Sequence, residues 1–241
     1  MEPKVRAFLR KTRKRMGLRR KPPRSSMARG LKWLADRGFM VETVLDIGAS
    51  SGVWSKECMN FFPEAQYVLF EPQPVHSEAL TRFAGSCRQR VIIVEKAAGA
   101  VEGRTYFLTD PEDPLGGALA SVVSENAITV DVTTVDASVT QFGLSAPFLV
   151  KLDTHGYEKS ILDGAGDTLE KTEVLIIEAY NYRISDEAML FWELCSYMSE
   201  RGFRPIDLVD IGYRKYDNSL WQMDLFFIRS GWEGFAYHGY R

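Results

Sequence analysis

The chain has 241 residues, of which 45% are hydrophobic and 26% are charged, and its formal net charge is -2. This is an ordinary globular composition, which excludes a disordered chain, a collagen and a disulfide-rich scaffold. Cys58, Cys87 and Cys195 are far apart and form no C-x-x-C motif, so a zinc ribbon is disfavoured and a reducing compartment is favoured. The sequence shows no membrane span and no apolar signal-peptide core, so we expect a cytoplasmic protein.

The first 24 residues are strongly basic, because eleven of them are Lys or Arg. A helix over residues 4–18 would place a short apolar stripe on one face and the cations on the other. Pro22 and Pro23 end this segment. We therefore predict a basic arm and linker over residues 1–26 and one folded domain over residues 27–241.

The domain alternates apolar runs with helical segments, starting with a helix near Met27. The runs VLDIG, YVLFE and VIIVEKA are predicted strands, separated by helices over 53–61 and 75–84. Such alternation is typical of a parallel sheet. The pattern then breaks, because TYFLT and ITVDVTTV flank residues 110–124 without a helix between them. We predict an inserted β-hairpin or flap there.

The alternation resumes with FLVKLD, a helix over 157–169, VLIIEAY and a helix over 187–201. Two last strands, over 204–211 and 222–228, have no helix between them and suit an antiparallel edge. The predicted fold is therefore α/β and Rossmann-like, with a mostly parallel sheet and an antiparallel C-terminal edge.

A loop of small residues, DIGASSG over 46–52, follows the first strand at the place where doubly wound sheets bind their ligands. Gly48 and Gly52 allow a tight turn and a close approach to a ligand. The helix that follows offers N–H groups to a carboxylate, such as the methionyl end of S-adenosylmethionine. Glu71 ends the second strand, where it can accept hydrogen bonds from two ribose hydroxyls.

Other nucleotide ligands fit this loop less well. A nicotinamide dinucleotide needs G-x-G-x-x-G, but Ser50 and Val53 stand where the second and third glycines belong. The chain has no G-x-x-x-x-G-K-[ST] for a nucleoside triphosphate. The remaining alternative is that Gly48 and Gly52 only make a tight turn between strand and helix.

Four segments resemble the FkbM family of S-adenosylmethionine-dependent methyltransferases: DIGASSGVWS, FEPQPVHSEAL, the Ala97-Ala98 pair and KLDTHGYEKSILDGA. The resemblance spans residues 44–178 and is most distinctive over 151–158. It implies a class I methyltransferase fold, S-adenosyl-L-methionine as cofactor, and O-methylation of a hydroxyl on a small metabolite, sugar or lipid-linked glycan. Ser50 and His155 depart from the family pattern, which commonly has Asn at the first position and Glu or Gln at the second.

The loop, the acid and the resemblance together predict a set of cofactor-binding residues. These are Asp46, Gly48, Ala49, Ser50, Gly52, Trp54, Glu71, Pro72, Ala97 and Asp153. The fourth-strand motif of the family falls on Lys151, Asp153, Gly156 and Glu158.

Lys151, Asp153 and His155 are the candidate catalytic residues. Methyl transfer from a sulfonium is an in-line displacement, so the protein mainly aligns the reactants, but a hydroxyl acceptor must also lose its proton. Asp153 and His155 follow the strand over 148–152, and imidazole is the side chain that titrates nearest neutral pH, which favours His155 as base. Alternatively, His155 is structural, Asp153 caps a helix, and Lys151 pairs with Asp153 or Glu158 in a buried ion pair.

Glu178 and Asn181 could join Asp153 in holding a divalent cation through oxygen ligands. Such oxygens are common at strand ends without a metal, so we predict none. The stretch 178–182 and the flap are expected to face the acceptor. Nucleobase methylation is disfavoured, because Asp153-Thr-His-Gly stands where an Asn/Asp-Pro-Pro-aromatic turn would be expected.

The expected partner is a small-molecule or glycan hydroxyl acceptor. The basic residues over 4–24 could also contact an anionic membrane surface or nucleic acid. The alternative function is therefore a nucleic-acid-binding or RNA-modifying protein that uses this arm. The aromatic residues over 232–240 are a candidate homodimer contact.

Overall fold

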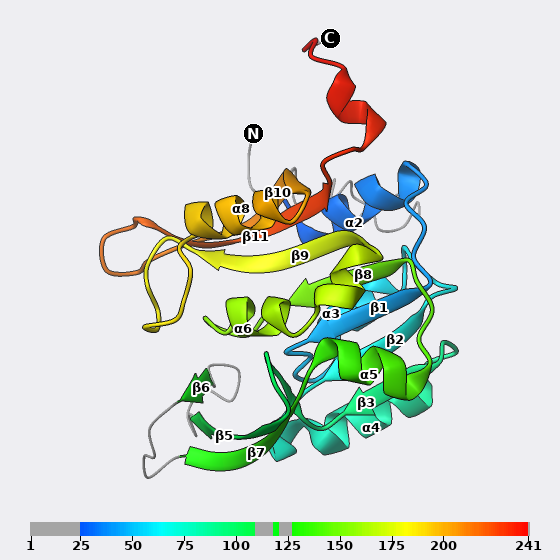
Figure 1. Ribbon diagram of the computed structural model, residues 1–241, viewed down its shortest axis with the longest axis vertical. Coiled ribbons are helices and arrows are strands. Elements are labelled where there is room, and N and C mark those ends of the chain that lie inside the picture. The colour runs from blue at the N-terminus through cyan, green and yellow to red at the C-terminus, as the bar shows by residue number, and fades with distance from the viewer. Residues whose placement is uncertain (1–24, 109–117, 121–126, 241) are drawn as a thin grey trace, which may run out of the picture.

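The computed structural model of the chain describes residues 25–108, 118–120 and 127–240 (Figure 1). Its main sheet has seven strands in the order β10-β11-β9-β8-β1-β2-β3. Five of them are mutually parallel: β1 (Thr43–Ile47), β2 (Gln66–Phe70), β3 (Val91–Val94), β8 (Phe148–Leu152) and β9 (Thr172–Tyr180). The mostly parallel α/β sheet predicted from the sequence is thereby confirmed.

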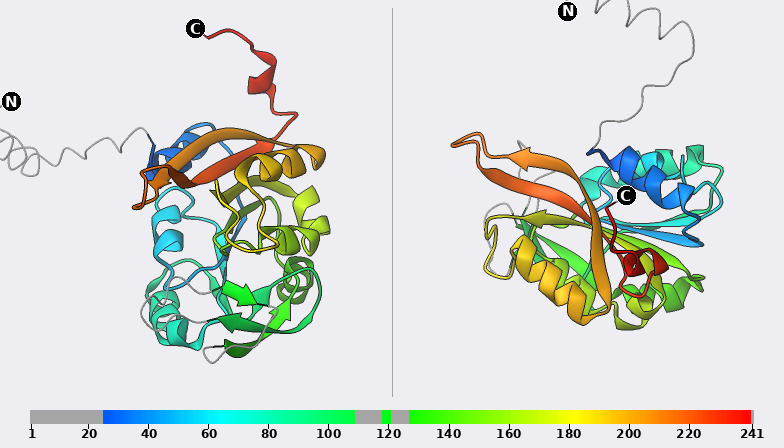
Figure 2. Two further views of the ribbon diagram at one scale, coloured as in Figure 1. Left: turned by 90° about the vertical axis from the view of Figure 1, so that its left-hand side faces the viewer. Right: turned by 90° about the horizontal axis from the view of Figure 1, so that it is seen from above.

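The C-terminal edge of this sheet is the predicted antiparallel pair. It consists of β10 (Phe203–Tyr213) and β11 (Leu220–Arg229), and β11 lies antiparallel to β9. The turn between β10 and β11 projects beyond the body of the molecule (orange in Figure 2). The hairpin therefore lies beside the carboxyl end of β9.

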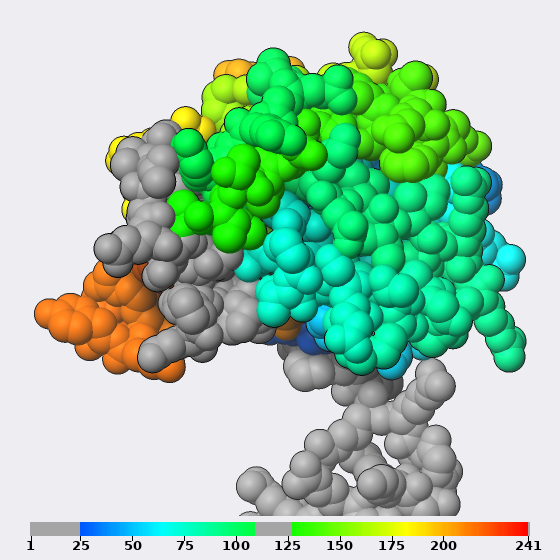
Figure 3. Space-filling model, turned by 90° about the horizontal axis from the view of Figure 1, so that it is seen from below, coloured from blue at the N-terminus to red at the C-terminus, as the bar shows by residue number. Residues whose placement is uncertain are grey.

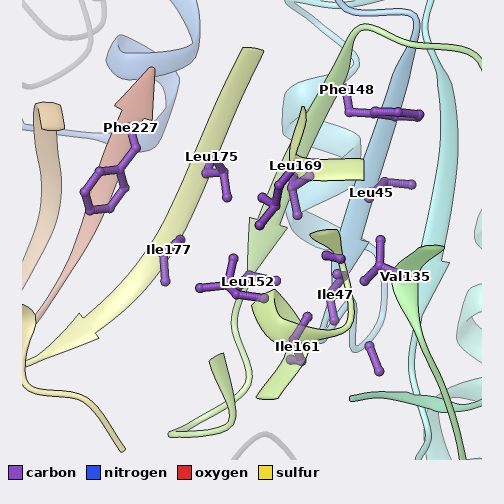
Figure 4. Close-up of a cluster of buried hydrophobic side chains, with 14 of the residues drawn as sticks. Leu45, Ile47, Val135, Phe148, Leu152, Ile161, Leu169, Leu175, Ile177 and Phe227 are labelled. Atoms are coloured by element: carbon purple, nitrogen blue, oxygen red, sulfur yellow. The ribbon is translucent and has the colours of Figure 1, made fainter. Parts of the chain in front are cut away.

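Alternating side chains give the sheet two apolar faces. Leu45 and Ile47 of β1 point into one core, together with Leu175 and Ile177 of β9 (Figure 4), whereas Val44 points into the other. This alternation follows from the period of two along a strand. Both faces are buried, as expected for parallel strands covered by helices on each side.

The helices divide between these two faces. One core contains side chains of α2 (Met27–Asp36), α3 (Val53–Cys58) and α4 (Ser77–Ser86, preceded by the 3-10 turn η1, Pro74–His76). The other contains side chains of α5 (Val135–Phe142), α6 (Glu158–Asp163), α7 (Gly166–Glu170) and α8 (Phe191–Glu200). The 3-10 turn η2 (Glu233–Ala236) follows β11 near the C-terminus.

A second, four-stranded sheet lies at the end of the molecule that Figure 3 shows, beside α4. Its order is β4-β7-β5-β6, with β4 (Ala97–Ala98), β5 (Gly103–Leu108), β6 (Ala118–Ala120) and β7 (Ala127–Thr133). The pairing of β5 with β7 is the predicted inserted hairpin. Residues 109–117 and 121–126 of the predicted flap lie outside the described residues.

The sequence patterns missed two features of this region. The third strand was predicted over VIIVEKA, which includes Ala97, but β3 ends at Val94, and Ala97 and Ala98 pair with Val132 and Thr133 in the second sheet. Helix α5 was not predicted at all, although Thr134 caps it by accepting a hydrogen bond from the amide of Ala137 at 3.0 Å. The capping residue was visible in the sequence, but the helix has only eight residues.

The helix predicted over 157–169 is split into α6 and α7. The break lies at Gly164, which packs directly against the backbone of Gly99, so that a Cβ at Gly164 would stand 2.0 Å from the Gly99 carbonyl oxygen.

The predicted basic arm, including the helix over 4–18, lies outside the described residues. Helix α2 begins at Met27, where the folded domain was expected to start. Across the described segments, no helix combines the length and apolar character needed to cross a bilayer.

Candidate active site

A cavity of about 240 Å³ opens at the carboxyl ends of β1, β2 and β8. Parallel strands present these ends at one edge of the sheet, so loops distant in sequence meet there. The lining residues are Ile47, Gly48, Ser50, Phe70, Glu71, Pro72, Gln73, His76, Lys96, Ala97, Ala98, Phe107, Asp153, Thr154, His155 and Ile161. The predicted strand tips therefore do share one pocket.

The loop after β1 lies very close to the loop after β8. Gly48 has a φ of 84°, and a Cβ there would lie 2.0 Å from the carbonyl oxygen of Asp153. Its amide and that of Ala49 donate hydrogen bonds to the carbonyl of Phe70, each at 3.0 Å. Glycine is thus required at position 48 both by conformation and by the close packing of backbone on backbone.

Ser50 presents an unused polar atom in this loop. Its φ is 48°, which is uncommon for a residue other than glycine. Its Oγ is buried and has no hydrogen-bond partner among the described residues, although Ser50 lines the cavity. Because buried polar groups are nearly always paired, this hydroxyl indicates a site for a polar ligand.

Glu71 ties the second strand tip to the first. Its Oε2 accepts a hydrogen bond from the amide of Ser50 at 2.8 Å, and its Oε1 accepts one from the amide of Gln73 at 2.9 Å. Burial raises the pKa of this carboxyl, while the two backbone N–H groups oppose the shift. The side chain is only 5% exposed, so it is held in one orientation toward the cavity.

Four of the predicted cofactor residues do not line the cavity. Asp46 is buried below it, where its carboxylate accepts a 2.5 Å hydrogen bond from Ser55 at the start of α3, and burial raises its pKa to about 6. Gly52 packs against the Phe83 ring. Ala49 and Trp54 belong to the apolar core on the α2–α4 face. In this arrangement these residues shape the loop.

The other six predicted cofactor residues line the cavity, and so does His155. Several further lining residues were assigned no role in the sequence analysis: Gln73, His76, Lys96, Phe107, Thr154 and Ile161. Gln73 and His76 stand in the segment FEPQPVHSEAL, which could have drawn attention to them. Phe107 and Ile161 show only ordinary hydrophobicity in the sequence.

Lys151 is a buried cation, only 2% exposed, in the strand β8. Its Nζ lies 3.1 Å from Oδ2 of Asp153 and 3.1 Å from Oδ1 of Asp224 in β11. Burial by itself would lower the pKa of Lys151. The carboxylates of Asp224 and Asp153 have the larger effect, so the pKa of Lys151 lies above its ordinary value. Of the two partners expected for Lys151, Asp153 is in contact and Glu158 is not.

Glu158 instead organises the loop that leads into α6. Its Oε1 accepts hydrogen bonds from the amide of Gly156 at 3.0 Å and from the hydroxyl of Thr154 at 3.2 Å. This loop places His155 with a φ of 53°, so His155 is the second residue other than glycine with a positive φ on the cavity wall, after Ser50. Positive φ values at residues other than glycine are concentrated at functional sites.

Asp153, His155 and Glu178 converge beside the cavity, with one potential ligand atom from each lying within 4.8 Å of the others. His155 Nε2 is 3.8 Å from Glu178 Oε2. Burial raises the pKa of Asp153, but Lys151 lowers it more, so that its pKa falls below the ordinary value. Burial and the nearby Asp153 raise the pKa of Glu178 to about 8.

Glu178 also has two neutral hydrogen-bond donors, the hydroxyl of Tyr180 and the side-chain amide of Gln222. The set Asp153, His155 and Glu178 has the ligand types of a divalent-cation site. Asn181, considered as a further ligand, donates a hydrogen bond from Nδ2 to the carbonyl of Leu220 at 3.2 Å.

Comparison with known families matches the methyltransferase FkbM domain over residues 46–205. The chain belongs to this family. The match begins near the end of β1 and ends in β10, and so covers every strand tip around the cavity. This FkbM protein accordingly carries a methyltransferase FkbM domain with the class I fold.

Among individual proteins, the chain is 26% identical over 157 residues to the 2-O-methyltransferase NoeI of Sinorhizobium fredii. That match covers 56% of this chain and 62% of NoeI, so the chain spans less than two thirds of its relative. Similar solved structures include an rRNA methylase from Streptococcus thermophilus (TM-score 0.50, 9% identity, 87% of this chain and 99% of that one). Another is a Methanococcus jannaschii fibrillarin pre-rRNA processing protein (TM-score 0.50, 13% identity, 79% and 67%). At these identities the structures support the fold alone.

Proposed function

We propose that this FkbM protein transfers a methyl group to a hydroxyl of a small metabolite, a sugar or a lipid-linked glycan, with His155 as the base. The observation that carries the proposal is the position of His155. It lies on the wall of the cavity, directly after β8, and its side chain is 33% exposed. The matched relative is itself an O-methyltransferase by name, which supports the same acceptor class.

The residues around the cavity fit S-adenosylmethionine. Glu71 would accept the ribose hydroxyls, because each carboxylate oxygen has lone-pair capacity beyond its one backbone hydrogen bond. The unpartnered hydroxyl of Ser50 and the glycine backbone at position 48 would bind polar groups of the same ligand. When bound, the cofactor supplies an electrophilic methyl group on a sulfonium.

The base must remove a proton from a hydroxyl that is weakly acidic on its own. Asp153 is the less suitable candidate, because its pKa is lowered by Lys151, and a carboxylate of low pKa is a weak base. His155 lines the cavity, and its Nε2 lies 3.8 Å from Oε2 of Glu178. We therefore assign base catalysis to His155 and an orienting role to Asp153.

The proposal is tested with S-adenosylmethionine that carries a labelled methyl group and with panels of free sugars, lipid-linked glycans and small alcohols. We expect the label in an ether, which survives mild alkali, whereas a methyl ester would not. His155→Gln should lower the transfer rate by about 10²- to 10⁴-fold, the usual contribution of a general base, and leave cofactor affinity unchanged. A base-labile ester, an N-methyl product, or full activity of the variant would contradict the proposal.

The other expectations about partners and location also stay proposals. The three cysteines are free in the structure, which supports a reducing compartment such as the cytoplasm. The basic arm over residues 1–26 is proposed as a contact for an anionic surface, and the residues around Trp232 as a homodimer contact.

A further inference from the structure

We propose that Glu178 is a positioning residue for His155, because its Oε2 keeps the ring proton on Nε2 and so leaves Nδ1 as the nitrogen that takes the acceptor's proton. This inference rests on the proposed function, in which His155 is the base. It adds a residue from a neighbouring strand to the reaction and assigns a different task to each ring nitrogen of His155.

Two neighbouring strands bring these two side chains close together. His155 follows β8, and Glu178 lies in the adjacent parallel strand β9. The Nε2 to Oε2 distance is 3.8 Å, beyond the roughly 2.7–3.2 Å of an N–H···O hydrogen bond, so the proposed bond requires the two side chains to move closer. Hydrogen bonds in the active sites of free enzymes are often long and shorten when ligands bind.

Glu178 can select one nitrogen because it is itself held in place. Its side chain is 10% exposed, and donors from Tyr180 and Gln222 hold one carboxyl oxygen each. Oε2 still has a lone pair for Nε2–H, and it remains an acceptor whether the carboxyl is ionised or neutral. A fixed acceptor on one ring nitrogen determines the tautomer and thus which nitrogen is free to act as base.

The other carboxyl groups near the ring have closer partners than His155. Asp153 is paired with Lys151 at 3.1 Å. Glu158 accepts its two hydrogen bonds from Gly156 and Thr154, within its own loop. Within the described part of the chain, Glu178 is the carboxylate that lies within 4 Å of a His155 ring nitrogen.

The proposed role also balances charge in the reaction. As the acceptor oxygen forms its bond to the methyl carbon, the bond from that carbon to sulfur breaks and sulfur keeps the electron pair. The hydroxyl proton moves to Nδ1, so the positive charge lost by the sulfonium reappears on the imidazolium. That imidazolium would keep its Nε2–H beside Oε2 of Glu178, which can accept the hydrogen bond whether the carboxyl is neutral or ionised.

The test observes the ring directly, by NMR of protein labelled with ¹⁵N-histidine and saturated with S-adenosylhomocysteine, at mildly alkaline pH. The chain has three histidines, so His155→Gln assigns the signal by its disappearance. We expect Nε2 to be protonated and protected from exchange, and Nδ1 to be unprotonated. In Glu178→Leu the Nε2 proton should exchange at least about tenfold faster, while Glu178→Gln, which keeps an acceptor oxygen, should retain most of the protection.

Glu173→Leu is the matched control, since Glu173 lies in the same strand, away from the cavity. A protonated Nδ1 in the wild type would overturn the inference, and so would equal exchange rates in wild type and Glu178→Leu. If Glu178→Leu does not fold, Glu178→Gln alone provides the test. An Nε2 proton that exchanges about tenfold faster in Glu178→Gln than in the wild type would then also contradict the inference. This readout needs no methyl acceptor, so its failure is separate from failure of His155→Gln to slow methyl transfer.

Discussion

The carboxylate of Glu71, at the end of β2, accepts a 2.8 Å hydrogen bond from the backbone amide of Ser50, in the loop after β1. The contact joins two strand tips that lie 21 residues apart in the sequence. Both residues line the same cavity. The acid therefore has two tasks, to hold the loop in its positive-φ conformation and to present its remaining lone pairs to the cofactor.

Glu71→Gln should weaken binding of S-adenosylmethionine by about 10- to 100-fold, because charge-assisted hydrogen bonds contribute about 1.5 to 3 kcal/mol each. Isothermal titration calorimetry measures the change. Glu78→Gln is the control, since that glutamate is 83% exposed on α4. Equal affinities of wild type and Glu71→Gln would show that the cofactor lies elsewhere.

Gly48→Ala tests the close packing of the loops after β1 and β8. Gly38 has a similar φ, 74° against 84°, but nothing lies within 4 Å of its virtual Cβ. Gly38→Ala should therefore lower the free energy of unfolding by about 1 to 2 kcal/mol, from backbone strain alone. Gly48→Ala should lower it further and weaken cofactor binding, as urea unfolding and calorimetry can show. Equal losses in the two variants would contradict the close approach to Asp153.

The strand tips of the site could be predicted because their signals are local. A glycine loop that follows a buried strand, and an acid that ends the next strand, each occupy a few consecutive residues. Parallel strands then bring both to one edge without further information. The loop over 46–52, Glu71 and the pair Asp153 and His155 were located in this way.

The rest of the site depends on contacts that no local pattern carries. Ala97 meets Val132 across the second sheet, and Phe107 reaches the cavity only because β5 pairs with β7. Asp224 was not considered as a partner of Lys151, because β11 follows β8 by some 70 residues and reaches it through β9. Asp46 has the sequence position of a ligand residue, yet its carboxylate bonds to Ser55 below the cavity.

Lys151→Met should be strongly destabilising. It leaves Asp153 and Asp224 without their shared cation, and breaking one partner of a buried ion pair typically costs about 3 to 5 kcal/mol. Lys159→Met is the matched control, because Lys159 pairs with Asp163 on the exposed face of α6, where such pairs contribute about 0 to 1 kcal/mol. Urea unfolding at neutral pH compares the two. A similar loss in free energy of unfolding for the two variants would mean that the folded protein does not depend on the buried cation of Lys151.

Removal of residues 1–26 tests the basic arm. If the arm contacts an anionic partner, the full chain should bind RNA or liposomes of anionic lipid in a salt-dependent manner, because each contact releases counterions. The truncated chain should lose that binding and keep its affinity for S-adenosylmethionine. RNA retention and liposome flotation, measured separately, distinguish a nucleic acid from a membrane surface. Equal binding by both chains would exclude the arm as the contact.

Glu178 should make the stability of the protein depend on pH. Burial and Asp153 raise its pKa from about 4.5 to about 8, so between these values the folded protein holds a proton that the unfolded chain has lost. Its contribution to stability is therefore complete below about pH 4.5, decreases as pH rises, and is gone above about pH 8. The decrease is at most about 1.4 kcal/mol per pH unit.

Glu178→Gln removes this titration while keeping the shape of the side chain. The difference in free energy of unfolding, wild type minus variant, should fall steadily from about pH 5 to about pH 8 and then level off, as measured by urea unfolding across that range. Glu173→Gln, in the same strand, should show a constant difference. A constant difference for Glu178→Gln as well would mean that the carboxyl is ionised in the folded protein across this pH range. The buried cluster would then hold one negative charge that neither the cation of Lys151 nor the protons of neighbouring groups balance.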